Sequence, residues 1–109
     1  MTKGGNKPRL AGARFELAVV KDQERIGRWA AKLRQGGGEV VDIVSIERCP
    51  SGRCRGFRCV SHIYFIQCKL RNPYLPPLEL ERLQMDAQAI GATPLVAWRD
   101  KGIQYKDIS

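Results

Sequence analysis

The chain has 109 residues and a formal net charge of +8, which is enough length for one domain with a single hydrophobic core. No stretch resembles a secretory leader or a membrane-spanning apolar run, so we expect no membrane association and a cytoplasmic protein, or one in a host cytoplasm if a virus encodes it. The positive charge is concentrated in residues 1–15 and 48–71, which favours a polyanionic partner such as nucleic acid over a solvated basic surface without a partner.

The first predicted element is a helix that follows a flexible segment. Residues 1–11 are rich in Gly, Pro and basic residues and contain few core-forming side chains, which predicts a flexible basic N-terminal arm. From Gly12 to about Ile26, apolar side chains recur at helical spacing with charges between them, which predicts an amphipathic helix. Gly27 is expected to end this helix.

Three strands are expected after the helix. Residues 28–34 fit either a continued helix or a strand bracketed by glycines, and we favour a strand because of the family resemblance described below. Residues 40–46 are β-branched and nearly continuous, which is typical of a strand buried on both faces. Residues 60–70 are predicted to be the returning strand of a long hairpin, with the Cys- and Arg-rich residues 48–59 as an excursion between the two strands.

A second helix and two more strands complete the predicted order α-β-β-β-α-β-β. The helix follows the proline-containing residues 72–77, and Gly91 is expected to end it. Its apolar face would carry Leu80, Leu83, Ala87 and Ile90. Residues 94–98 and 103–108 are then predicted to be two strands joined by a short turn.

Polar residues interrupt the predicted strands in a pattern that indicates a catalytic site. Gln67 and Lys69 end the third strand, and they project to the same face because side chains alternate along a strand. Asp42 can come from the neighbouring strand beside them. It could also be a surface group, but a carboxylate in an otherwise buried strand costs free energy unless it is paired or bound to a metal ion. Three such groups predict a metal-dependent phosphodiesterase.

The order of elements and the residues at their joints resemble the archaeal-type Holliday junction resolvases of the PD-(D/E)xK nuclease superfamily. The resemblance covers residues 12–109 and rests on Gly12-Ala13-Arg14-Phe15-Glu16, Arg34 eight positions before Asp42, Gln67-Cys68-Lys69, and residues 91–98. It implies a single α/β restriction-endonuclease-like domain, in which a central mixed sheet of about five strands is flanked by helices. Residues 48–59 would be an inserted basic hairpin.

The resemblance also implies a catalytic site. Its members would be Glu16, Asp42, Gln67 and Lys69. Asp42, Gln67 and the main-chain carbonyl of Cys68 would hold Mg²⁺, for which Mn²⁺ would substitute, and Glu16 would reach the ion directly or through water. Gln67 stands where the family has an acid, and a neutral amide oxygen should bind Mg²⁺ more weakly. Restriction-type nucleases of the Mrr kind look similar in carrying Gln-x-Lys there, so we expect Gln67 to remain a ligand. Glu16 could otherwise be a solvated helix residue.

The predicted DNA contacts come from basic residues in both charged segments. They are Arg14, Arg34, Arg48, Arg53, Arg55, Arg58 and Arg71. The inserted hairpin, with Phe57 near its tip, is expected to reach a junction, although it could also be a loop without order in the absence of DNA. Two symmetric nicks imply a homodimer. Candidate interface residues are Leu83, Leu95 and Trp98, which could equally be ordinary core.

The cysteines raise the alternative of a zinc site. Cys49, Cys54 and Cys59 recur every five residues, and His62 and Cys68 follow. Zinc is disfavoured because the paired C-x₂-C spacing is absent and because Cys68 projects to the face opposite Gln67, where it is expected in the core. A disulfide between Cys54 and Cys59 is disfavoured in a reducing cytoplasm, unless the source is a hyperthermophile.

Three function classes are therefore carried forward. The first is an endonuclease that resolves four-way DNA junctions by paired symmetric nicks. The second is an Mrr-like restriction or repair nuclease that acts on ordinary duplex DNA. The third is a DNA-binding protein without enzymatic activity.

Overall fold

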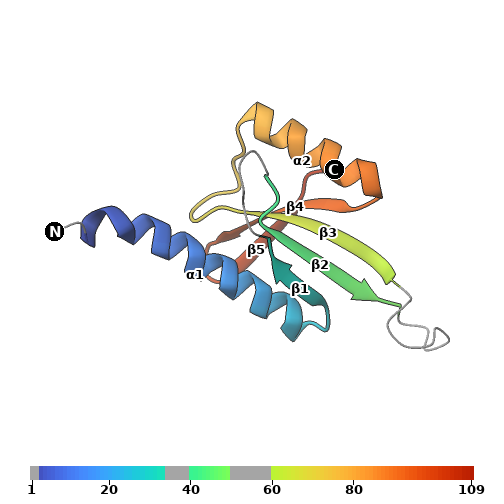
Figure 1. The fold of residues 1–109 in the computed structure, drawn as a ribbon, viewed down its shortest axis with the longest axis horizontal. Coiled ribbons are helices and arrows are strands. Elements are labelled where there is room, and N and C mark those ends of the chain that lie inside the picture. Colours follow the sequence, from blue (N-terminus) through green and yellow to red (C-terminus); the bar gives the residue numbers. More distant parts are fainter. Residues whose placement is uncertain (1–2, 34–39, 50–59) are drawn as a thin grey trace.

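The computed structural model of the protein describes residues 3–33, 40–49 and 60–109. Within these residues, two helices and five strands follow one another in the predicted order. Figure 1 labels each of these elements. The elements are α1 (Lys3–Arg25), β1 (Trp29–Lys32), β2 (Ile43–Arg48), β3 (Val60–Cys68), α2 (Pro77–Ile90), β4 (Thr93–Arg99) and β5 (Ile103–Asp107). The α/β class and the strand interpretation of the segment after the first helix are both confirmed.

The five strands form one mixed sheet whose spatial order is β1-β2-β3-β4-β5. All neighbours are antiparallel except β3 and β4, which are parallel and are connected through α2. The predicted hairpin is confirmed, because β2 and β3 pair from Ile43 opposite Ile66 to Arg48 opposite Val60. The start of β2 and the end of β3 therefore lie together at one end of the sheet, near Asp42. The residues that flank the 50–59 segment lie at the other end, far from Asp42.

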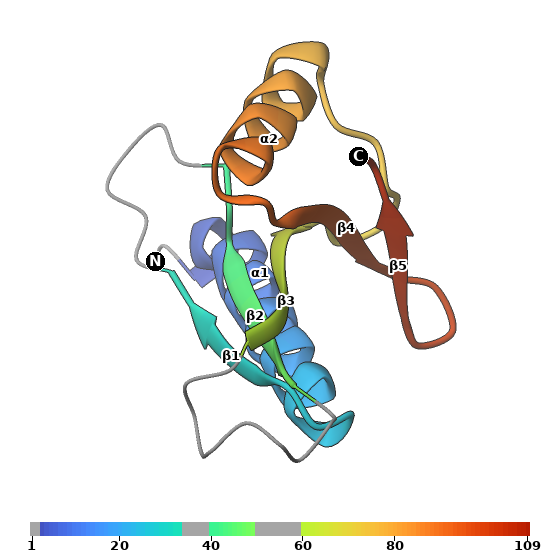
Figure 2. The same ribbon diagram turned by 90° about the vertical axis from the view of Figure 1, so that its right-hand side faces the viewer.

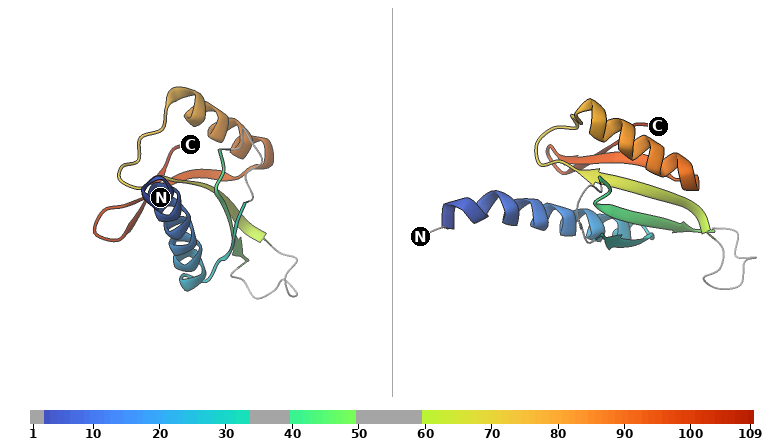
Figure 3. Two further views of the ribbon diagram at one scale, coloured as in Figure 1. Left: turned by 60° about the vertical axis from the view of Figure 1, so that its left-hand side comes forward. Right: turned by 45° about the horizontal axis from the view of Figure 1, so that its top comes forward.

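The helices cover opposite faces of the sheet, which makes three layers (Figures 2 and 3). Against α1, the core is formed by Phe15, Val19, Ala30, Ile43, Ile66, Leu95 and Ala97. Against α2, it is formed by Val41, Leu75, Leu83 and Val96, with Phe65, Trp98 and others packed around them. Neighbouring residues of β3 and β4 therefore enter different cores, which explains the continuous apolar runs Ile63–Ile66 and Leu95–Trp98 within these strands.

The first helix begins nine residues earlier than predicted. Residues 3–11, interpreted from sequence as a flexible arm, belong to α1, which extends beyond the sheet toward the N-terminus (Figure 1). Their Gly and Pro content makes them poor at nucleating a helix. Once the later turns are packed on the sheet, each added residue only has to propagate that helix, which costs less than nucleation.

The second helix ends as predicted but buries less than its whole apolar pattern. Gly91 adopts a left-handed backbone conformation with φ 74°, and the next amide N–H, that of Ala92, donates to the Ala87 carbonyl at 2.8 Å. Leu83 and Ala87 are fully buried, whereas Ile90 in the last turn is 56% exposed. Ile90 was predicted on the buried face, but contact with the sheet ends one turn earlier.

Two residues considered for a subunit interface belong to the core of the single chain. Leu83, on the sheet-facing side of α2, is fully buried, and Leu95 of β4 is buried in the core against α1. The core alternative is therefore confirmed for both, and Trp98 also packs against the α2 core. No helix among the described residues is long and apolar enough to cross a membrane.

Candidate active site

The predicted catalytic residues of β2 and β3 meet at one end of the sheet. Asp42 comes just before β2, but its main chain still pairs on both sides: its N–H donates to the Ile66 carbonyl at 2.9 Å, and its carbonyl accepts from the Leu33 N–H at 2.8 Å. On the other side of β3, the Lys69 N–H donates to the Ala97 carbonyl of β4 at 2.8 Å. Asp42, Gln67 and Lys69 thus lie where β3 ends and β2 begins.

The Asp42 carboxylate is buried and fixed by the main chain of β3. Asp42 is 4% exposed, and its Oδ2 accepts a hydrogen bond of 2.7 Å from the Cys68 N–H. A charge so far from water is costly unless it is hydrogen-bonded or paired, and this bond to an ionised acceptor offsets part of that cost. The bond also ties the segment before β2 to the end of β3.

Gln67 carries an unsatisfied oxygen at the same place. Its side-chain carbonyl Oε1 is buried and has no hydrogen-bond partner in the part of the chain that the structure describes. An unmade hydrogen bond of this kind costs about 1–3 kcal/mol, so such an atom requires an explanation. Oxygen is the ligand type that Mg²⁺ prefers, and the Gln67 oxygen is the side-chain atom that the sequence pattern assigns to the metal.

Lys69 is held by a residue that sequence analysis did not include in the site. Its Nζ lies 3.2 Å from Oε2 of Glu79, in the first turn of α2. Sequence patterns mark Glu79 only as an acid that suits the positive end of a helix. Its approach to Lys69 follows from α2 packing on the face toward which Phe65, Gln67 and Lys69 all project.

Glu16 lies at the same end of the sheet but on the α1 side. Its Oε1 is 2.9 Å from Nζ of Lys32, at the end of β1. Burial raises the pKa of the Cys68 thiol well above its usual value, and the nearby carboxylates of Asp42 and Glu16 raise it further. Both acids therefore act electrostatically on the end of β3, although Glu16 is engaged by Lys32. Cys68 packs in the α1 core, as predicted.

These residues fit an open metal site better than a closed one. Within residues 3–33, 40–49 and 60–109, no three His, Cys, Asp or Glu side chains are grouped closely enough to hold a metal ion. Among the described residues, the side chains that could contribute oxygen at the end of β3 include the buried Asp42 carboxylate and the unpartnered Gln67 amide oxygen. Mg²⁺ is often bound by only one or two carboxylates, with waters and substrate phosphates completing its coordination. The donor set is compatible with that arrangement.

The predicted DNA-binding residues are distributed over more than one region. Arg14 and Arg71 are exposed near the end of the sheet that carries the candidate active site. Arg48 is the last residue of β2, at the end of the sheet opposite Asp42. Outside the described residues lie Arg34, Arg53, Arg55 and Arg58, together with Phe57, Cys54 and Cys59. Of the other zinc candidates, His62 hydrogen-bonds Thr93 through its ring nitrogen and packs against Tyr64.

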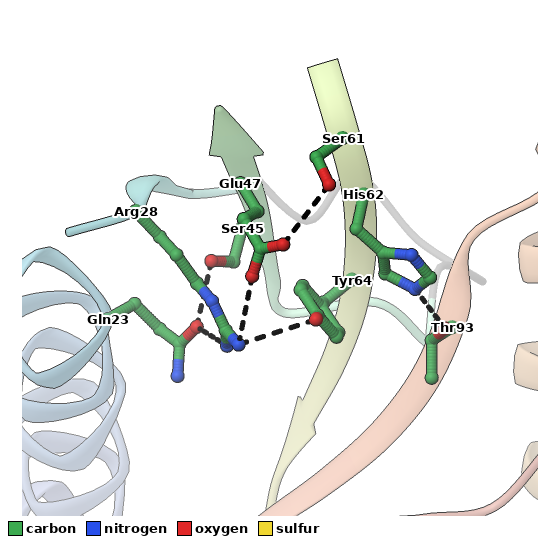
Figure 4. A network of polar contacts seen from close by, with 8 residues as sticks. All are labelled: Gln23, Arg28, Ser45, Glu47, Ser61, His62, Tyr64 and Thr93. Atoms are coloured by element: carbon green, nitrogen blue, oxygen red, sulfur yellow. Dashed lines mark hydrogen bonds and ion pairs between the residues drawn. The ribbon is translucent and has the colours of Figure 1, made fainter. Parts of the chain in front are cut away.

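A polar network that sequence reasoning missed occupies the opposite end of the sheet (Figure 4). Arg28 donates to Gln23 Oε1 at 2.8 Å and to the Tyr64 hydroxyl at 3.3 Å, and it lies 3.6 Å from a Glu47 oxygen. Ser45 Oγ donates to the same Gln23 oxygen at 2.8 Å. The network joins the last turns of α1 to β2 and β3. The sequence offers no periodic signal for it, because its members come from four separate segments.

Comparison with known proteins supports the fold. No protein-family model matches the chain, and no curated protein matches its sequence significantly. Among solved structures, it is similar to Hjc of Archaeoglobus fulgidus, a Holliday junction resolvase from an archaeal hyperthermophile. The TM-score is 0.68 at 24% identity, over 89% of this chain and 77% of that one. The likeness establishes a resolvase-like fold, which agrees with the family resemblance seen in the sequence.

Proposed function

We propose that this protein is a Mg²⁺-dependent endonuclease that resolves four-way DNA junctions, with Mn²⁺ as a substitute ion. One observation carries the proposal: a buried Asp42 carboxylate, an unpartnered Gln67 oxygen and the Lys69 ammonium group occur together at one end of the sheet. The likeness of the fold to an archaeal Holliday junction resolvase supports junctions as the substrate.

The metal ion would be held by Asp42, the side-chain oxygen of Gln67 and the main-chain carbonyl of Cys68. Glu16 would contribute directly or through water, after exchanging its contact with Lys32. When bound, the ion supplies polarisation of the scissile phosphate and a lower pKa for a coordinated water. Because the protein offers few charged ligands, we expect occupancy to depend on phosphate oxygens of the DNA.

The remaining steps belong to the side chains. The Cys68 N–H fixes the orientation of the Asp42 carboxylate. Lys69 would orient the attacking water and donate to a phosphate oxygen where negative charge develops in the transition state. Glu79 contacts Lys69 rather than the reacting atoms, so it is a positioning residue that keeps the ammonium group at the end of the sheet.

A four-way junction also requires two cuts related by a two-fold axis. One site cannot make both in concert, and a symmetric substrate is matched by an isologous dimer of identical chains. We therefore propose a homodimer as the active form.

The decisive experiment is cleavage of a labelled four-way junction during a Mg²⁺ titration. We expect paired symmetric nicks from the wild-type protein and a loss of about 100-fold or more in Lys69→Ala, because a positioned charge contributes several kcal/mol in the transition state. Junction binding by Lys69→Ala should remain. Lys106→Ala, at an exposed lysine of β5, is the matched control and should cut normally. Unchanged cutting by Lys69→Ala would show that the site is wrongly placed.

A nuclease for linear duplex is the second candidate, and the neutral Gln67 favours it through the resemblance to Mrr-like enzymes. Comparing a junction with a linear duplex of the same arm sequence separates the two activities, because equal rates would identify the duplex nuclease. Absence of cutting with both Mg²⁺ and Mn²⁺, together with retained DNA affinity, would instead identify a DNA-binding protein without enzymatic activity.

A further inference from the structure

A small basic pocket lies beside the candidate active site, on the α1 side of the sheet. Its volume is about 210 Å³, and it is lined by Ala11, Arg14, Phe15, Leu70 and Arg99. Leu70 directly follows Lys69, and Arg99 is the last residue of β4, which pairs with β3 in parallel. The pocket and the candidate active site thus share the same end of two adjacent strands.

The two arginines of this pocket have no carboxylate partner among the residues that the structure describes. Within the described part of the chain, neither Arg14 nor Arg99 forms an ion pair, whereas Arg25, Arg28 and Arg82 each lie within 4.0 Å of a carboxylate. The Arg99 guanidinium carbon is 5.3 Å from the centroid of the Phe15 ring. A cation above an aromatic face is held there by the ring quadrupole. Because Phe15 is a buried core residue, its ring is held in place, and this fixes the position of the Arg99 guanidinium group above it.

We propose that this pocket binds one backbone phosphate of the DNA, next to the phosphate that is cut. Two guanidinium groups without carboxylate partners repel each other, and an anion between them relieves that repulsion. The planar fork of a guanidinium matches the oxygens of a phosphate group. A nucleobase is a poorer occupant, because Phe15 is only 3% exposed and offers no free ring face for stacking.

The position of the pocket determines which phosphate it takes. This step rests on the proposed function, since it assumes that the scissile phosphate lies at Lys69. A DNA strand that passes over the end of β3 brings successive phosphates past Lys69 and then past Leu70. The Arg14–Arg99 pocket would hold the backbone on one side of the cut and set its register without reading sequence.

The test measures DNA binding without cutting. In an Asp42→Asn background, the affinity for a four-way junction is measured at several salt concentrations. The Arg14→Gln/Arg99→Gln double variant should bind about tenfold more weakly, and the slope of log K against log salt should become less negative by about 1, as expected for one lost phosphate contact. Arg99→Lys should retain the slope because it keeps the charge. Arg82→Gln, at an arginine paired with Asp86 on α2, is the matched control and should leave the slope unchanged.

An unchanged slope in the double variant, with unfolding by urea as in the parent, would overturn the phosphate site. If the double variant does not fold, the single variant Arg14→Gln decides, because Arg14 is an exposed helix residue that forms no ion pair with any described residue. Binding of inorganic phosphate at the pocket with no change in the DNA slope would also overturn the assignment to DNA. Failure of the nuclease proposal would appear differently, as a wild-type protein that does not cut while the double variant still shows the reduced slope.

Discussion

The two ends of the sheet differ in how many of their polar groups have partners within the protein. At the end near the last turns of α1, Arg28 contacts an amide oxygen, a hydroxyl and a carboxylate. At the end where β3 and β4 finish, Gln67 has a buried oxygen without a partner, and Arg14 and Arg99 have no ion pair among the described residues. The polar residues of the first end bind mainly to one another, although the amide nitrogen of Gln23 has no hydrogen-bond partner in the described part of the chain. The second leaves donors, acceptors and charges that a ligand would satisfy.

This difference between partnered and unpartnered polar groups indicates which end of the domain binds a ligand. A polar group that has partners contributes to stability, and its removal should unfold the protein before it affects chemistry. A polar group without partners costs stability and is expected to persist where a ligand uses it. Substitutions at the two ends should therefore separate activity from stability.

The largest effect is expected for Asp42→Asn. The amide keeps an oxygen for the Cys68 N–H but removes the carboxylate that is buried at the end of β3. Cleavage of the junction should fall by about 100-fold or more, because charge at a metal site contributes several kcal/mol in the transition state. The free energy of unfolding, measured with urea, should change by about 1 kcal/mol or less because the hydrogen bond is retained. Normal cutting by this variant would show that Asp42 is not a catalytic residue.

At the other end, Arg28→Ala should affect stability and leave the chemistry intact. It removes hydrogen bonds to Gln23 and Tyr64 and the contact with the Tyr64 ring at 4.1 Å. We expect the free energy of unfolding to fall by about 2–3 kcal/mol in urea titrations. Cutting per folded molecule should stay close to wild type. Arg25→Ala is the matched control, because its ion pair with Asp22 is on the surface and should contribute about 0–1 kcal/mol.

A sharper comparison comes from Gln67→Glu, which adds charge at the unsatisfied oxygen. The Mg²⁺ concentration for half-maximal cutting should fall by about tenfold, because a carboxylate binds Mg²⁺ more strongly than an amide. Without metal, the new charge lies near Asp42, so the free energy of unfolding should decrease, and added Mg²⁺ should restore it. Gln67→Met, which has similar length but no oxygen ligand, should raise the Mg²⁺ requirement instead. Equal Mg²⁺ dependence in all three proteins would argue against Gln67 as a ligand.

The smallest effect is expected for Glu79→Gln. The ion pair with Lys69 is partly exposed, with 29% of the lysine side chain and 39% of the glutamate side chain accessible, so its loss should change stability by about 0–1 kcal/mol. Cutting should fall about threefold to tenfold, because Lys69 is less well positioned, and Glu79→Asp should recover part of that loss. Glu81→Gln, two residues along the same helix, should have no effect on cutting. A loss as large as that of Asp42→Asn would mean that Glu79 contacts the metal or the substrate rather than Lys69 alone.

Much of the fold could be predicted because its signals are local. The β-branched runs, the prolines before α2 and the left-handed Gly91 each report on a few neighbouring residues. The pairing of Gln67 with Lys69 on one face follows from strand alternation alone. The start of α1 was predicted wrongly because its first turns depend on a helix that is anchored elsewhere, and the exposure of Ile90 depends on where the sheet ends.

The order of elements, the excess of basic residues and the strand end on which Gln67 and Lys69 project together could all be read from the amino-acid sequence. Three contacts could not: Glu79 with Lys69, Lys32 with Glu16, and the pocket that Arg14 and Arg99 share. The two groups differ in the range of the interactions that produce them. Periodicity and turn chemistry act between neighbours in the chain, whereas these contacts join residues of different elements and exist only after the helices have packed on their faces of the sheet.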